Sequence, residues 1–177
     1  MKGRPAPATG LLRQIDAVAR AAFPTGLTAL LMVLAAVSAG LPGLVPAVAL
    51  PCIVFWAIFR PAALPPPAVF ALGLLGDLLS FAPVGSGVLT LLVVAGLVTR
   101  WRRSLAQQSF LAVWLAYCGV ALGAAALEWV LQVVLGWQLL PLAPGLYQVM
   151  LSAGLYPGLA WVLSRMHEAM SRAESAP

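Results

Sequence analysis

The longest stretches of this chain that lack any charged side chain decide what it can fold into. Five of them follow one another with few charged residues between: 21–59, 61–76, 78–99, 104–127 and 129–164. A helix that crosses a bilayer needs about 20 consecutive apolar residues, so these stretches supply several crossings. The chain is 62% hydrophobic and 8% charged, whereas a soluble domain carries about 25% charged residues. We therefore predict an all-α membrane protein that crosses the bilayer several times.

Glycine and proline divide these stretches into six segments that we expect to be transmembrane helices. Five of the predicted helices cover 23–39, 44–59, 68–81, 107–135 and 145–164, and the fourth in chain order runs from the turn at 82–87 to the basic cluster at 100–103. The second, third and fourth helices are short, nearer ~15 residues than the ~20 of a full crossing. They are either tilted, partly re-entrant or packed around a cavity, or they lie in a locally thinned bilayer.

The positions of the basic residues test this number of helices. With six crossings, the loops and tails of one side hold every lysine and arginine: Lys2, Arg4, Arg13, Arg20, Arg60, Arg100, Arg102, Arg103, Arg165 and Arg172. By the positive-inside rule both termini are cytoplasmic, whereas five crossings would place the C-terminal arginines on the wrong side. We predict a membrane domain over 23–166 between two cytoplasmic tails, 1–22 and 167–177. The tails are polar, and we expect them to be disordered or to lie on the membrane surface.

Several function classes find no support in the sequence. The net charge of +5 and the pI near 10.0 reflect membrane topology rather than nucleic-acid binding, because the basic residues cluster at the ends of apolar stretches. Cys52 and Cys118 lie inside apolar stretches without metal or redox spacing, so we interpret both as packing residues. His167 has no second ligand at metal-site spacing and is expected near the lipid headgroups. We predict no metal, no cofactor and no nucleic-acid partner.

Residues 34–39, ahead of Gly40, resemble the small-residue cleavage site of a signal peptide. A long polar segment precedes the apolar core, however, and cleavage would leave an odd number of crossings, in conflict with the charge pattern. We therefore expect this segment to remain as the first membrane helix.

Asp77 and Glu128 are the two charged residues predicted to lie away from the cytoplasmic side. A carboxylate at bilayer depth is disfavoured by ~2.5 to more than 10 kcal/mol, depending on the scale used, so each needs a partner or a wet cavity. Both fall in the outer half of their helices, which would let them line one site. Three interpretations stay open: a hydrogen bond or helix cap, a proton or ion pathway, and a contact with a partner protein. In each, burial could also hold the carboxyl in its protonated form.

Other motifs point to helix packing rather than to catalysis. Gly85 and Gly87 follow Pro83 and predict a turn. Small residues four apart, at 119 and 123 and at 154 and 158, allow helices to approach closely. The chain has no Ser–His pair at membrane depth, no phosphate-binding glycine loop and no paired-aspartate motif for lipid phosphotransfer. We therefore expect that the protein is not an enzyme.

Several short segments, taken in order, resemble the rod-shape-determining MreD family, in particular its alphaproteobacterial members. They are residues 51–61, 64–66, 70–79, 83–85, 156–161 and 165–167. The resemblance implies a non-enzymatic protein of the cell-elongation complex, which includes the periplasmic scaffold MreC, MreB filaments, RodA and a class B penicillin-binding protein. It also implies a fold similar to the substrate-binding subunits of energy-coupling-factor transporters.

Two functions follow from this resemblance. The first is an inner-membrane scaffold that binds the transmembrane helix and periplasmic region of MreC and helps to control peptidoglycan synthesis and cell shape. The second is a small-molecule-binding subunit of an energy-coupling-factor-type transporter. Its mouth would be lined by Trp129, Trp137 and Tyr147, which otherwise form an interfacial aromatic belt.

We predict that partner binding centres on Asp77 and the turn at 83–87. Asp77 would fix the end of the third helix and its turn, so that the periplasmic side presents one defined surface. The candidate residues are Asp77, Pro83, Gly85, Gly87, Arg60 and Glu128.

Overall fold

The computed structural model describes residues 9–39, 43–136 and 141–175, which contain six α-helices, one short 3₁₀-helix and no β-strand. In chain order the elements are α1 (Thr9–Ala39), α2 (Leu44–Phe59), η1 (Pro61–Ala63), α3 (Pro66–Ser80), α4 (Ser86–Leu105), α5 (Phe110–Gly136) and α6 (Ala143–Ser175). The prediction of an all-α fold with six helices is confirmed for these residues.

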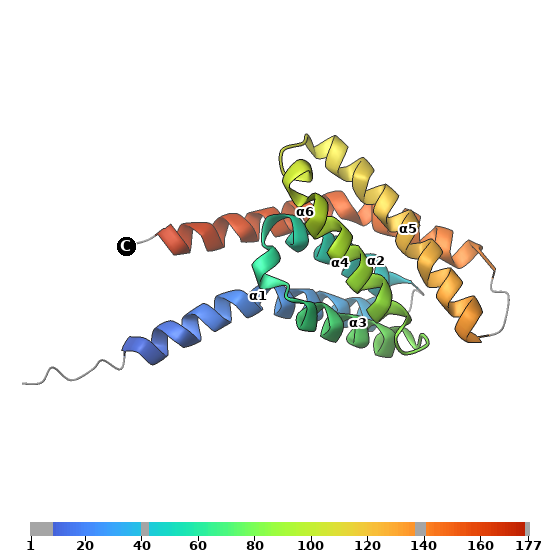
Figure 1. Ribbon diagram of the computed structural model, residues 1–177, viewed down its shortest axis with the longest axis horizontal. Helices are drawn as coiled ribbons and strands as arrows, with labels where there is room; N and C mark the ends of the chain where they lie inside the picture. Colours follow the sequence, from blue (N-terminus) through green and yellow to red (C-terminus); the bar gives the residue numbers. More distant parts are fainter. Residues whose placement is uncertain (1–8, 40–42, 137–140, 176–177) are drawn as a thin grey trace, which may run out of the picture.

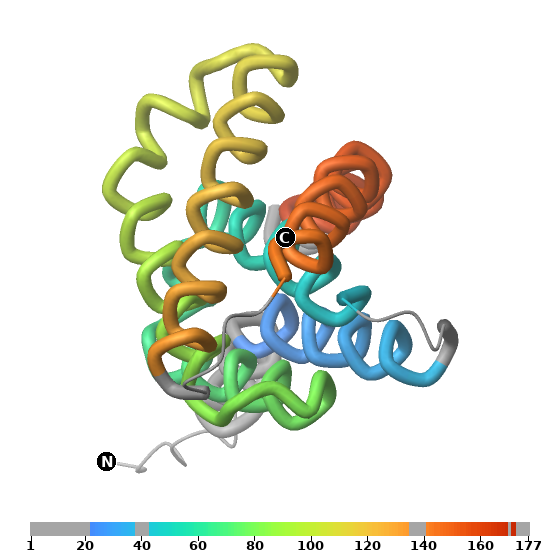
Figure 2. Tube along the Cα trace, turned by 90° about the vertical axis from the view of Figure 1, so that its right-hand side faces the viewer, coloured from blue at the N-terminus to red at the C-terminus, as the bar shows by residue number. Residues whose placement is uncertain are grey.

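Successive helices run back and forth between two ends of the molecule (Figure 1). The start of α1 and the end of α6 project beyond the bundle at the same end (Figure 1). Figure 2 shows α4 and α5 as a hairpin on one side of α2, with α1 and α6 on the other side. α2 packs against all the other helices and is therefore the central element.

The composition of α2 explains its central place. The helix carries no charge and is apolar on every side, and thirteen of its sixteen residues are buried, as expected for a helix that no polar face directs toward solvent. It begins after Gly43, whose left-handed φ of 85° favours glycine. It ends at Phe59, because the residue before a proline is disfavoured in helical conformation and Arg60 precedes Pro61. The predicted range, 44–59, is the one observed.

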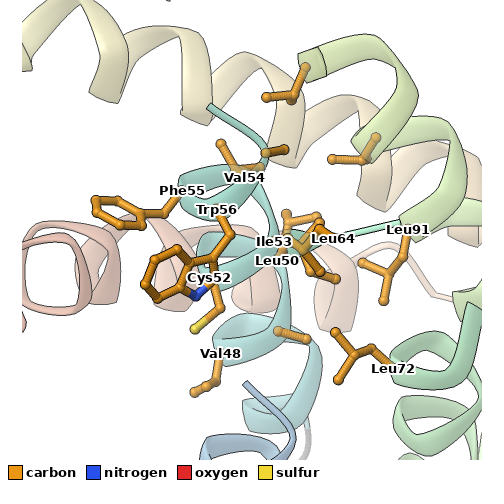
Figure 3. Packing of buried hydrophobic residues seen from close by; sticks show 14 of the residues in the cluster. Val48, Leu50, Cys52, Ile53, Val54, Phe55, Trp56, Leu64, Leu72 and Leu91 are labelled. Atoms are coloured by element: carbon orange, nitrogen blue, oxygen red, sulfur yellow. The ribbon is translucent and has the colours of Figure 1, made fainter. Parts of the chain in front are cut away.

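Side chains from the middle of α2 form the core. Cys52, Ile53 and Trp56 are each 0% exposed. Figure 3 shows Ile53 directed toward Leu91 of α4, while Phe55 points to the opposite side of α2. Cys52 thus packs as an apolar residue, in agreement with the sequence-based interpretation.

The two terminal helices are longer than predicted. α1 begins at Thr9 and α6 continues to Ser175, so both extend into the segments predicted as polar tails. In the N-terminal segment apolar residues recur every three or four positions, at 11, 12, 15 and 18, which is the spacing of one helix face. In the C-terminal segment Arg172 pairs with Glu168 at 3.3 Å, one helical turn away, a spacing that supports a helix.

Two segments are long and apolar enough to cross a membrane, Phe110–Val134 in α5 and Ala143–Ala169 in α6. Shorter apolar helices cover Ala22–Val37, Leu44–Phe59 and Pro66–Ser80. In the apolar 18-residue stretches of α5 and α6, 17% and 22% of the residues are buried inside the molecule. Most residues of these two segments are therefore not fully buried within the bundle.

Candidate functional site at the α3–α4 turn

The end of α3 is shaped by the backbone carbonyl of Asp77. This carbonyl accepts hydrogen bonds from the N–H groups of Phe81 and Ala82, the latter at 3.1 Å, a pattern that closes many helix C-termini. Phe81 takes the left-handed conformation, with φ 52°, and is the one non-glycine residue with positive φ in the described part of the chain. Glycine normally occupies this position, and the phenyl ring is 96% exposed. An apolar side chain is thus held fully exposed on a constrained backbone.

The carboxylate of Asp77 holds the start of α4. Asp77 is 2% exposed. Its Oδ2 accepts a hydrogen bond from the Gly85 N–H at 2.7 Å, and its Oδ1 accepts one from the Gly87 N–H at 2.8 Å. Gly85 is the N-cap residue of α4 and has no side chain to cap the helix. Asp77 therefore supplies the cap from the preceding helix, with its negative charge at the positive end of the α4 dipole.

Glycines at three positions make this arrangement possible, each for a different reason. Gly85 has φ 106°, which favours glycine. A Cβ atom on Gly87 would collide with Oδ1 of Asp77. A Cβ atom on Gly73 would lie 2.6 Å from Cα of Val88, so α3 and α4 cross with their backbones in contact.

Pro83 opens the turn, and its carbonyl closes it. That carbonyl accepts hydrogen bonds from the Ser86 N–H at 3.1 Å and from the Ser86 hydroxyl at 2.8 Å. Ser86 is 1% exposed, and its own carbonyl accepts a hydrogen bond from Thr90 Oγ1 at 2.8 Å. The structure thus brings together four of the six candidate residues, namely Asp77, Pro83, Gly85 and Gly87.

Glu128 lies on α5 and connects it to α6. Its Oε2 accepts a hydrogen bond from Nε2 of Gln148 at 3.2 Å. Glu128 and Asp77 line one cavity, together with Gln148, Ser152 and Thr90. The expectation that the two acids share one site therefore agrees with the structure. No lysine, arginine or histidine is among the described residues that line the cavity.

The size of this cavity limits what it can hold. Its volume is about 50 Å³, which accommodates a few water molecules, since one water needs ~10–15 Å³ by this measure. Pockets for small organic ligands measure roughly 300–1,000 Å³. Within the described residues there is also no group of three or more His, Cys, Asp or Glu side chains placed to bind a metal ion.

Comparison with known proteins does not identify the family of this chain. No protein-family model, curated protein or solved structure matches it. The resemblance to MreD therefore depends on the short segments quoted above and stays a prediction.

Sequence reasoning missed the polar residues of α6 that complete the cavity. Gln148 and Ser152 lie four residues apart and so face the same side of the helix. Ser152 is 2% exposed and hydrogen-bonds the Tyr117 hydroxyl, whose ring stacks on Tyr156 with centroids 4.1 Å apart. Polar residues at helical spacing inside an apolar stretch were the available signal.

Arg60 lies outside this site, at the opposite end of α2. Its Nε donates a hydrogen bond to Nδ1 of His167 at 3.2 Å. The ring of His167 also lies 6.0 Å from the ring of Phe59, centroid to centroid. Arg60 therefore connects α2 to α6 and does not contribute to the α3–α4 turn.

The aromatic residues predicted near the cavity mouth do not line it. Neither Trp129 nor Tyr147 is among the lining residues, and the Tyr147 side chain is 47% exposed. Trp137 lies outside the described residues. These positions give no support to an aromatic mouth and leave the interfacial belt as the plainer interpretation.

Proposed function

We propose that the protein is a non-enzymatic scaffold of the bacterial inner membrane that binds MreC within the cell-elongation complex. By holding MreC it would help to control peptidoglycan synthesis and cell shape. The observation that carries the proposal is the Asp77 carboxylate, which accepts hydrogen bonds from Gly85 and Gly87 and so fixes one turn. Three further features support it, namely the low burial of α5 and α6, the exposed tip of that turn and the small volume of the cavity.

The low burial of the apolar helices α5 and α6 supports a place in the membrane. A core helix of a soluble protein with such hydropathy would be mostly buried. In the apolar stretches of α5 and α6, 17% and 22% of the residues are buried. Exposed apolar patches of this extent need lipid or a partner. The end of α2, the end of α4 and the last turns of α6 lie toward the end of the molecule from which the start of α1 and the end of α6 project (Figure 1), and each of these segments carries or precedes an arginine in the sequence. By the positive-inside rule this end is cytoplasmic, and the α3–α4 turn is periplasmic.

The tip of the α3–α4 turn supports a protein partner. Phe81 and Val84 are 96% and 67% exposed. Both belong to the turn whose backbone is held by hydrogen bonds to Asp77 and Pro83. A surface that is already ordered loses little conformational entropy when it binds. Aromatic residues are also enriched where proteins contact one another. The turn therefore has the properties of a preorganised docking point for the periplasmic region of MreC.

The role of Asp77 in this scheme is structural. Both carboxylate oxygens accept hydrogen bonds from backbone N–H groups, which is the task of a helix cap and not of a proton carrier. The cavity of about 50 Å³ also argues against the transporter-subunit alternative, whose ligands are small organic molecules.

Affinity purification in mild detergent tests the proposal. We expect MreC to co-elute with the wild-type chain and to be reduced by a combined Phe81→Ala and Val84→Ala substitution. Leu142→Ala is the matched control, because Leu142 is also an exposed apolar residue, 60% accessible, in the segment before α6. Recovery of transporter ATPase subunits in place of MreC would overturn the proposal, as would unchanged MreC recovery by the double variant.

A further inference from the structure

A larger groove lies at the end of the molecule opposite the α3–α4 turn. It has a volume of about 440 Å³ and is bordered by the end of α2, the α4–α5 connection, the start of α5 and the middle of α6. Figure 1 shows α5 crossing α6 obliquely. The groove lies next to the first residues of α5, Phe110 and Val113. Its walls are mainly aromatic and aliphatic and include Phe55, Phe59, Phe110, Val113, Tyr156 and Trp161.

Two arginines lie next to residues that line this groove. Cζ of Arg165 lies 5.6 Å from the centre of the Trp161 ring, so the guanidinium is placed by the aromatic wall on α6. On the α2 side, Arg60 follows Phe59 directly and is held by His167 at 3.2 Å. An apolar groove thus has two guanidinium groups next to its lining residues Phe59 and Trp161.

This combination of chemistry selects the occupant. A hydrocarbon chain fits the apolar walls, and a phosphate fits the two guanidinium groups, which bind phosphate oxygens through paired N–H donors. A second copy of this chain would bring the same arginines against these and would be repelled. Free phosphate would leave the apolar groove unfilled. Basic pockets between membrane helices on the cytoplasmic side bind anionic lipid headgroups in other proteins.

We propose that this groove binds one anionic phospholipid, with an acyl chain between α5 and α6 and the headgroup phosphate at Arg60 and Arg165. The inference rests on the membrane placement proposed above but not on MreC binding. A bound lipid here would fill the space beside the α4–α5 connection and hold the basic ends of α2 and α6 at the membrane surface.

Native mass spectrometry of the purified full chain in detergent tests this inference. The probes are palmitoyl-oleoyl phosphatidylglycerol and palmitoyl-oleoyl phosphatidylcholine, which share their acyl chains and differ in headgroup charge. We expect one phosphatidylglycerol per chain, bound about tenfold more tightly than phosphatidylcholine because two arginines contact the anionic headgroup. Equal binding of the two lipids would overturn the proposal.

Substitutions separate the parts of the site. Arg60→Gln combined with Arg165→Gln should remove the preference for phosphatidylglycerol, whereas the corresponding pair of lysine substitutions should keep most of it. Ala160→Phe should weaken both lipids by filling the groove, and Val113→Phe serves if the first variant does not fold. Arg172→Gln is the matched control, since Arg172 lies on α6 beyond the groove and pairs with Glu168.

Three results would contradict the proposal. They are unchanged lipid preference in the double glutamine variant, equal loss in Arg172→Gln, and a doubled mass that shows a second copy in the groove. Inorganic phosphate, added as a third probe, shows whether the site recognises a lipid headgroup or free phosphate. If it binds through the same arginines as tightly as phosphatidylglycerol does, the site recognises soluble phosphate and not a lipid.

Discussion

Asp77 shows how one residue, through its backbone carbonyl and its side chain, can define both ends of a turn. Its carbonyl closes α3, and its carboxylate caps α4. A buried carboxylate is costly, and here two backbone N–H groups that would otherwise lack partners compensate that cost. The same residue is therefore an electrostatic liability in isolation and a stabilising group in this turn.

The first prediction concerns this carboxylate. Asp77→Ala leaves the Gly85 and Gly87 N–H groups without their acceptor, and we expect a loss of ~3–6 kcal/mol in the free energy of unfolding, since the two hydrogen bonds to a charged group contribute ~1.5–3 kcal/mol each. Asp77→Asn should lose less stability than Asp77→Ala, because its side-chain amide still offers one oxygen as an acceptor to the two N–H donors. Thermal unfolding in detergent measures both, and Glu168→Ala, which breaks an exposed ion pair, is the control. Stability equal to that of the wild type in both Asp77 variants would contradict the capping role.

The second prediction uses two glycines of the same helix. Gly87→Ala places a methyl group where Oδ1 of Asp77 lies, whereas Gly96→Ala on α4 meets no atom within 4 Å. We expect Gly87→Ala to lower the melting temperature by separating Asp77 from its donors. Gly96→Ala should leave it unchanged or raise it, because alanine favours a helix over glycine by ~1 kcal/mol. If the two substitutions had equal effects, the Asp77–Gly87 contact would not matter for stability.

Among the helices, α5 and α6 are connected by several polar side-chain links, one of which lies next to the cavity. Glu128 and Gln148 form this link at 3.2 Å, beside the cavity that Asp77 also lines. Hydrogen bonds between membrane helices contribute modestly, ~0.6 kcal/mol on average and up to ~1.7. The link therefore positions the two helices more than it stabilises them.

The third prediction tests this link. Glu128→Gln keeps a hydrogen-bond acceptor for Gln148 and removes an ionisable carboxyl group from the cavity wall, so we expect stability equal to or above that of the wild type. Glu128→Ala should cost ~1 kcal/mol, and the cost should shrink in a Gln148→Ala background, because the partner is then already absent. In a Cys118→Ala background, reaction of the buried Cys52 thiol with a maleimide dye during heating reports unfolding. A large loss in Glu128→Gln would show that the charge itself is required.

For the molecule as a whole, the sequence predicts the number of helices and the bounds of α2, because long uncharged stretches and Gly/Pro punctuation are strong local signals. It also singles out Asp77 and the turn after it. It offers a helix cap as one interpretation of Asp77 but does not specify that the capped helix is α4, since that depends on the left-handed conformation of Phe81, a residue type that rarely adopts it. The groove beside Arg60 and Arg165 depends on how α5 crosses α6, which no local pattern encodes.

The last prediction concerns how the whole molecule lies in the membrane. If the end with the arginines is cytoplasmic, the α3–α4 turn faces the periplasm and the end of α6 faces the cytoplasm. In a Cys118→Ala background, a membrane-impermeant maleimide should label Val84→Cys in intact cells and should label Arg172→Cys only after the inner membrane is opened. Both positions are exposed, so side-chain burial does not explain a difference between them. The reverse pattern would invert the topology, and equal labelling of both positions in intact cells would show that no membrane separates them.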